Sequence, residues 1–223
     1  MMMGSIASAL AEAWETGQPV APLCAEAALT SLDAAENVAG AVLEKLALAP
    51  CGIRVTEAGL VGAMLPGRIM AQGHPLPLAV LPHGRAAPAL LVVLAEAIAE
   101  NDTSLPAVAQ LHPALDLSAS RWRDGPANMC EAAADLAGLG QVVIGKGKAP
   151  SWPKSCALGA ERARRLDIAA LFATAVRVAR EAGGLPLGAV LVLVFDSAAQ
   201  ALAAPGPVTA RWTGLGAVSA ELR

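Results

Sequence analysis

The chain has 223 residues, of which 55% are hydrophobic and 16% charged, and its net charge is −3. This length suits one domain, or one domain with a small appendage, and it is enough to bury a large apolar core. The core is expected to be aliphatic, because the sequence holds no Tyr, two Phe and four Trp. Few rings to stack on bases and no excess of positive charge argue against nucleic acid as a partner.

The N-terminal stretch MMMGSIASALAEAWETG carries Glu12 and Glu15 where a signal peptide would need basic residues. The longest apolar runs, residues 86–95 and 189–195, are shorter than the roughly 18 to 20 residues that span a bilayer. We therefore expect a cytoplasmic protein with no membrane partner.

Cysteine and histidine give no sign of a metal site. No C-x-x-C pair and no H-x-x-x-H pair occurs, so zinc spacing is absent and buried thiols are the expectation. The residues concerned are Cys24, Cys51, Cys130, Cys156, His74, His83 and His112.

The first fifty residues predict two helices. Residues 5–16 place Ile6, Leu10 and Trp14 at helical spacing before Gly17, and residues 31–46 repeat an apolar helical pattern. Residues 1–50 are therefore expected to form an N-terminal helical segment.

From Cys51 onward, short apolar runs broken by Gly and Pro predict strands. These runs are GIRVT, PLAVLP, PALLVVLAEAI, QVVIG, GAVLVLVF, PVTARWTG and AVSAEL. A short helix at residues 106–111 and a long one at 162–182 are expected to interrupt them. Strands outnumber helices without alternating regularly with them, which favours an α+β domain with a mixed or antiparallel sheet over residues 51–223.

The common sequence motifs of nucleotide-binding sites and hydrolases are incomplete or absent. GQVVIGKG, residues 140–147, has the spacing of a phosphate loop, but Gly147 stands at the Ser/Thr position and the centre of the segment is typical of a strand. Neither G-x-G-x-x-G nor G-x-S-x-G is present. The sequence therefore gives no support for a dinucleotide cofactor or a hydrolase nucleophile.

The stretch LHPALDLSASRWRD, residues 111–124, concentrates charge in an otherwise apolar chain. PALDLSASRWRD, followed by EAAADLAGLGQVVIG and by WTGLGAVSAEL at the C-terminus, resembles the 2-keto-4-pentenoate hydratase and 4-oxalocrotonate decarboxylase family, a branch of the fumarylacetoacetate hydrolase superfamily. LAEAWETGQPVAPL and ALTSLDAAENV follow the family's opening pattern, so the resemblance covers nearly the whole chain. It implies an α+β fold in which a mixed β-roll of the fumarylacetoacetate hydrolase type follows N-terminal helices.

The resemblance also implies a magnesium ion that is held by three carboxylates, binds a 2-oxo acid and stabilises an enolate. Asp116 falls on one ligand position, but Ala87 and Ala89 stand where the family has two Glu residues on one strand. One carboxylate is too few to hold a hard cation. We therefore expect no cofactor, and magnesium only if other carboxylates such as Glu57 or Glu96 rebuild the site.

Other positions of the family's site are partly kept. Gly52 stands in place of a lysine, with Arg54 close to it in sequence. The resemblance implies Asp116 and Asp135 as candidate catalytic residues. The candidate substrate-binding residues are Arg85, Ser120, Arg121, Arg123 and Asp124. The same charged groups would equally serve as a buried network that holds the roll together.

Three functions follow from these positions. The first, which we predict, is a divergent hydratase-like protein that binds a small carboxylate or 2-oxo acid metabolite, with altered or lost lyase activity. The second is an active hydratase or decarboxylase with a rebuilt site, and the third is a non-catalytic subunit that pairs with an active paralogue. Because family members associate, a homo-oligomer is also expected.

Overall fold

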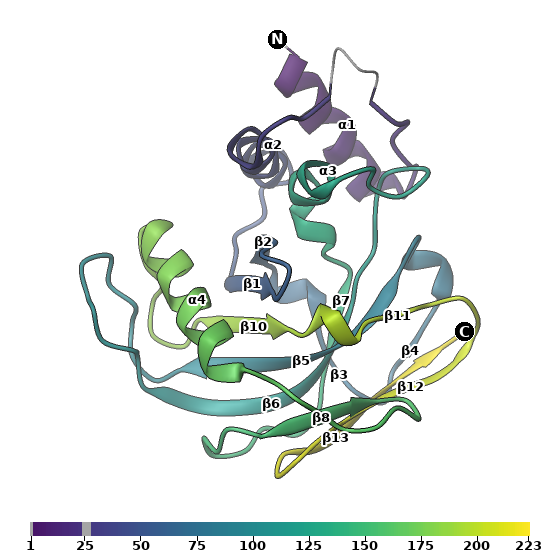
Figure 1. Ribbon diagram of the computed structural model, residues 1–223. Helices are drawn as coiled ribbons and strands as arrows, with labels where there is room; N and C mark the ends of the chain where they lie inside the picture. Colours follow the sequence, from purple (N-terminus) through teal and green to yellow (C-terminus); the bar gives the residue numbers. More distant parts are fainter. Residues whose placement is uncertain (1, 24–27) are drawn as a thin grey trace.

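The structure is a computed structural model that describes residues 2–23 and 28–223, so the predicted buried thiol of Cys24 lies outside the described residues (Figure 1). Helices α1 (Met2–Thr16), α2 (Leu32–Lys45) and α3 (Met129–Ala134) gather at one end of the molecule. Ser31 caps α2, because its hydroxyl accepts a hydrogen bond from the Ala34 N–H. The two N-terminal helices are therefore confirmed.

A larger sheet lies beneath these helices, with strand order β2-β1-β10-β5-β6-β7-β3 and with β11 beside β5. The β1–β10 and β3–β7 pairs are parallel and the other pairs are antiparallel, so the sheet is mixed. Its strands are β1 (Gly52–Thr56), β2 (Val61–Met64), β3 (Ile69–Ala71), β5 (Arg85–Leu94), β6 (Val108–Leu117), β7 (Gln141–Ile144), β10 (Val190–Val194) and β11 (Gln200–Ala201).

A smaller sheet, in the order β4-β13-β12-β8-β9, packs with α4 against the other face of the larger one. Its strands are β4 (Pro75–Leu76), β8 (Ser155–Leu158), β9 (Arg164–Arg165), β12 (Gly206–Trp212) and β13 (Gly216–Leu222), and the helix is α4 (Ile168–Glu181). Short 3-10 turns are η2 (Pro66–Arg68), η3 (Leu78–Val80), η4 (Leu136–Gly138) and η5 (Asp196–Ala198). The predicted α+β class is confirmed.

Strand alternation makes two apolar cores. Successive residues of a strand point to opposite faces, so Leu90 and Val92 of β5 join the core toward α4 and the smaller sheet. Ala87, Ala89 and Leu91 join the core beneath the N-terminal helices. The predicted helical segment and the sheet thus share one core, while the proposed boundary at residue 50 stays a prediction.

Three of the predicted elements are wrong. Residues 106–111 were expected to be helical, but they enter β6, because that strand pairs with β5 on one side and β7 on the other. PLAVLP forms the turn η3 in place of a strand. The long helix begins at Ile168 and not near residue 162, because the Asp167 carboxylate accepts a hydrogen bond from the Ala170 N–H and caps it there.

None of the described helices is both long and apolar enough to cross a bilayer. The cysteines of the described part are free thiols; Cys156 is buried, and Cys51 and Cys130 are half-buried.

Candidate functional site

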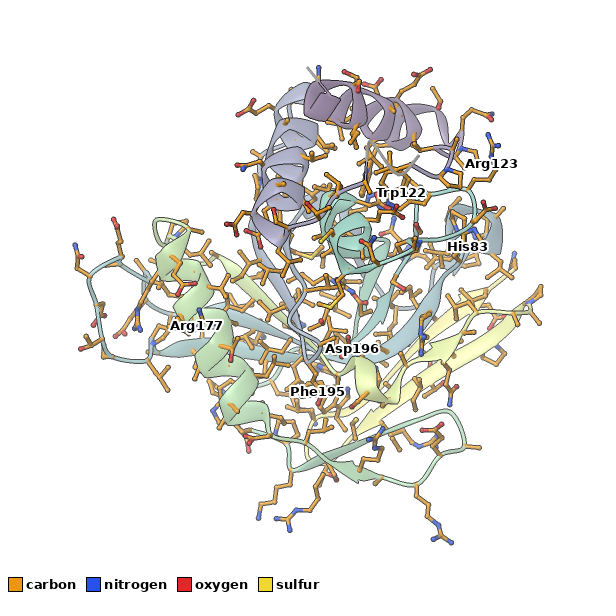
Figure 2. The ribbon with its side chains drawn as sticks, turned by 45° about the horizontal axis from the view of Figure 1, so that its top comes forward. His83, Trp122, Arg123, Arg177, Phe195 and Asp196 are labelled. Carbon is orange, nitrogen blue, oxygen red and sulfur yellow. The ribbon has the colours of Figure 1, made fainter. Side chains whose placement is uncertain are left out.

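A cavity of about 410 Å³ lies on the helix-covered side of the larger sheet, and we call it the first cavity. Figure 2 shows His83 beside Arg123 at one side of the molecule and Asp196 nearer its centre. Strands of the sheet, the turn η4 and the segment before β5 all contribute side chains to this cavity. The polar residues that line it are Arg54, Thr56, His83, Arg85, Asp116, Ser118, Ser120, Asp135 and Asp196.

A buried ion pair joins Arg54 of β1 to Asp116 of β6. Arg54 Nε donates to Asp116 Oδ1 over 2.7 Å and Nη2 donates to Oδ2 over 2.6 Å, while Nη1 donates to the Ala137 carbonyl over 2.8 Å. Both side chains are at most 4% exposed. Burial disfavours the charged form of Arg54, but Asp116 outweighs it and the pKa of Arg54 is raised. Arg54 is therefore a permanent cation of the site.

The curl of the sheet brings the two residues together, since β10 and β5 lie between β1 and β6 in strand order. Arg54 pairs with Val192 and Ala87 pairs with Asp116, so all of these side chains share the helix-covered face. The small side chain of Ala87, which lines the same cavity, leaves room for the guanidinium group to reach across. Long side chains at positions 87 and 89 would compete with Arg54 for this space.

The turn η4 holds the third partner of Arg54 in a costly conformation. Leu136 and Ala137 have φ values of 50° and 55°, which residues other than glycine rarely adopt. The conformation presents the Ala137 carbonyl to Arg54 Nη1. Such strain is commonly kept where it positions a functional group.

The residues present do not fit a divalent cation. Asp116 lies at an implied ligand position, but the Arg54 fork occupies both of its oxygens, and its neighbours Ala87 and Ala89 offer none. Glu57 instead accepts a hydrogen bond from Ser197, and Glu96 accepts one from Ala107, and neither lines the first cavity. Within the described residues, no cluster of three His, Cys, Asp or Glu side chains could hold a metal. The described donors of the first cavity therefore do not suit magnesium.

A lysine, which the resemblance implies at position 52, does not fit in place of Gly52. A Cβ atom built there would lie 1.8 Å from the Val190 carbonyl oxygen, because β1 and β10 approach closely. Positions 52 and 54 share one face of β1. Arg54 is thus the cationic side chain that this strand supplies.

A second buried pair joins Asp135 to Arg121. Asp135 Oδ2 accepts the Arg121 backbone N–H over 2.7 Å. Arg121 Nε lies 3.0 Å from Asp135 Oδ1, an ion-pair distance, but the two atoms are not aligned as a hydrogen bond. Burial raises the pKa of Asp135 to about 6, although Arg121 opposes the shift. Asp135 is therefore a carboxyl group that titrates within the first cavity.

The stability that Asp135 contributes is expected to fall as the pH rises from about 4 to about 6. With a pKa raised from 3.8 to about 6, the folded chain holds the proton more tightly than the unfolded chain. The contribution is complete below the unfolded pKa and is lost as the pH passes the folded one. Urea unfolding of the chain and of its Asp135→Asn variant across this range should show the unmodified chain losing stability relative to the variant. The opposite slope would contradict the shift.

The structure brings together some of the predicted site residues and separates others. Asp116, Asp135, Arg85 and Ser120 line the first cavity, beside Ala87. The Arg121 side chain instead lines a neighbouring cavity. Arg123 and Asp124 are exposed and line neither cavity, and Arg123 serves through its carbonyl, which contacts His83 Nε2 over 2.8 Å. The binding and catalytic roles of all these residues stay predictions.

Sequence reasoning missed the role of Arg54 and the presence of Thr56, His83 and Asp196 in the cavity. The signal for Arg54 was a single charge inside GIRVT, a strand that is buried throughout. A buried charge requires a partner of opposite charge. Such a partner was to be expected on another strand of the same sheet.

No protein-family model and no curated protein matches the sequence. Solved structures do match. 4-Oxalocrotonate decarboxylase from Pseudomonas putida G7, complexed with magnesium and adipate, superposes with a TM-score of 0.78 and 15% identity over 99% of this chain and 97% of that one. Its complex with calcium and acetate gives a TM-score of 0.76 at the same identity and coverage.

Fumarylpyruvate hydrolase from Pseudomonas aeruginosa, complexed with Mn²⁺ and pyruvate, gives a TM-score of 0.56 and 18% identity over 74% of this chain and 79% of that one. The chain therefore has the fumarylacetoacetate hydrolase type of fold, as the resemblance implied. Over its whole length, that fold is similar to the fold of 4-oxalocrotonate decarboxylase.

Proposed function

We propose that the chain is a divergent, hydratase-like protein that binds a small carboxylate or 2-oxo acid in the first cavity without a metal ion. The observation that carries the proposal is the bidentate Arg54–Asp116 pair, which places a fixed cation at the Asp that the resemblance implies as a metal ligand. The similar structures contain acetate, adipate or pyruvate, which are ligands of this class.

Arg54 keeps donors for a ligand. A guanidinium group carries five N–H donors, and three of those of Arg54 are engaged by Asp116 and Ala137. One N–H on each terminal nitrogen is left. Arg54 lines the cavity, so these two N–H groups are suited to the two oxygens of a carboxylate.

Arg85 supports the same assignment from the cavity's outer part. Its side chain is exposed, and Nη2 donates to the Ala199 carbonyl over 3.0 Å, which holds the guanidinium group at the rim. A ligand carboxylate reaching this rim would gain a second charge-assisted contact.

Lyase activity is expected to be altered or lost. In a magnesium enzyme the metal supplies the charge that stabilises an enolate, and the donor set here does not fit that ion. The raised pKa of Asp135 suits this cavity carboxyl group to proton exchange near neutral pH. We also propose that the chain assembles as a homo-oligomer or with a paralogue. Such an assembly would bury exposed apolar side chains, among them Leu105 and Trp152.

Calorimetric titration of pyruvate and of adipate into the protein in the presence of EDTA tests the proposal. We expect saturable binding that is the same with Mg²⁺ in place of EDTA. Arg85→Gln should weaken the binding about tenfold or more, because a charge-assisted hydrogen bond is lost. Arg177→Gln is the matched control, because Arg177 lies on α4 away from His83 and Arg123 (Figure 2). Binding that appears only with Mg²⁺ would favour the active magnesium lyase and refute the proposal.

A further inference from the structure

A second cavity, of about 390 Å³, lies between the end of α1, the turn η2 and the segment that follows β6. Ala119 and Ser120 line both cavities and form the wall between them. The second cavity is lined by apolar side chains together with Arg68 and Arg121. No role in the first cavity accounts for this pair of arginines.

Arg121 keeps two donors free. Its side chain is 10% exposed. Nη1 donates to the Ala119 carbonyl over 2.8 Å and Nη2 donates to the Leu139 carbonyl, but Nε has no hydrogen bond. Nε faces Asp135 Oδ1 at 3.0 Å, so of the five N–H donors of the guanidinium group one on each terminal nitrogen is left without an acceptor in the described part of the chain.

Arg68 adds a second positive charge to this cavity. Its guanidinium carbon lies 4.5 Å from the centre of the Trp14 ring, and that of Arg121 lies 3.7 Å from the same ring. Within residues 2–23 and 28–223, Arg68 makes no ion pair and its side chain no hydrogen bond. Two guanidinium groups therefore share one aromatic ring, while among the carboxylates that the structure describes only that of Asp135 pairs with one of them.

Burial and neighbouring positive charges both disfavour the charged forms of these arginines. Burial lowers the pKa of Arg68. Burial also lowers the pKa of Arg121 to about 10; Asp135 opposes that shift, and the neighbouring charges of Arg68 and Arg54 add to it. A bound anion would relieve the repulsion between these arginines.

We propose that the second cavity is a binding site for a small oxyanion, whose carboxylate or phosphate group lies between Arg68 and Arg121 beside the Trp14 ring. Arginine is the side chain best suited to bind such groups with two parallel hydrogen bonds. The remaining lining, which includes Ala13, Val80 and Leu139, suits a compact apolar body attached to the anionic group. This site does not rest on the function proposed for the first cavity.

Calorimetric titration of two probes, inorganic phosphate and propionate, distinguishes the two kinds of anion. We expect saturable binding of at least one of them, weakened about tenfold or more by Arg68→Gln. Arg85→Gln removes a charge from the first cavity only, and Arg177→Gln removes one from the surface of α4. Arg177→Gln should bind both probes as the unmodified chain does, and Arg85→Gln should bind phosphate as the unmodified chain does. Propionate is also a ligand of the class proposed for the first cavity, so for propionate the second site is read from Arg68→Gln alone.

Tryptophan fluorescence supplies a second readout, because Trp14 lies in the cavity wall. The bound probe should change the emission of the unmodified chain, and the change should disappear in Trp14→Phe. Absence of saturable binding by both probes would overturn the second site. Phosphate binding that Arg85→Gln weakens and Arg68→Gln does not would also overturn it, and so would binding of both probes that Arg68→Gln leaves unchanged. Failure of pyruvate to bind in the first cavity, with phosphate binding intact, would refute only the proposed function.

Discussion

Replacing Asp116 by alanine is expected to lower the free energy of unfolding by about 3 to 5 kcal/mol. The variant leaves the Arg54 guanidinium group buried, with a side chain 4% exposed, and facing no carboxylate. The hydrogen bond from Nη1 to Ala137 would remain but would not balance the charge. Urea unfolding, followed by far-ultraviolet circular dichroism, measures the difference directly.

The double variant Arg54→Met/Asp116→Ala is the companion measurement. Removing both charges should restore most of the lost stability, because a buried ion pair contributes little beyond the cost of burying its members. Glu181→Ala is the matched control, since it breaks the Arg177–Glu181 pair, whose side chains are 60% exposed. An exposed pair of this kind contributes about 0.5 kcal/mol or less. If Asp116→Ala were no more harmful than Glu181→Ala, Asp116 would not be the partner that balances Arg54.

The triple variant Ala87→Glu/Ala89→Glu/Arg54→Ala is expected to bind Mg²⁺ at least about 100-fold more tightly than the unmodified chain. Ala87 is the cross-strand partner of Asp116, and Ala89 lies two residues along the same face. Three carboxylates would then face one point, and the competing cation would be gone. Calorimetry with Mg²⁺ measures the gain.

Thermal unfolding provides an independent reading of the same variant. Ala89 is fully buried, so a glutamate there should destabilise the metal-free protein. Added Mg²⁺ should raise the melting temperature of the triple variant, and more so at higher Mg²⁺ concentration, because the ion binds the folded state. Ala87→Gln/Ala89→Gln/Arg54→Ala keeps the size of the new side chains without their charge and should not respond to Mg²⁺. Equal Mg²⁺ affinity in the unmodified chain and the triple variant would show that a metal site already exists.

Local pattern predicted much of the fold. The apolar runs of β1, β7, β10, β12 and β13 are continuous enough to be recognised without knowledge of their partners. The whole of β6 was missed, because PAVAQL resembles a short helix and Pro113 interrupts the strand pattern. Pairing along both edges of β6 decides its conformation, and the Pro113 carbonyl still accepts a hydrogen bond from the Gly145 N–H over 2.8 Å. Such long-range pairing is not encoded in a short window of sequence.

The candidate site was predictable only in part. The resemblance implied that Asp116, Ala87 and Ala89 occupy the positions of one site, and the strand register pairs Asp116 with Ala87. The pairing of Arg54 with Asp116 depends on the curl of the sheet, which brings strands that are not neighbours close together. The direction of the Arg121 side chain depends on packing against Trp14 of α1. Neither relation has a signature at fixed sequence spacing.

Titration of Mn²⁺ into the unmodified chain, with pyruvate present, tests most directly whether Arg54 takes the place of a metal at Asp116. Free Mn²⁺ is counted from its electron paramagnetic resonance signal. With Arg54 occupying both oxygens of Asp116, the expected result is no saturable uptake of Mn²⁺, while pyruvate still binds. Micromolar uptake of Mn²⁺ that requires pyruvate and is lost in Asp116→Ala would contradict the account and restore a metal-dependent reaction.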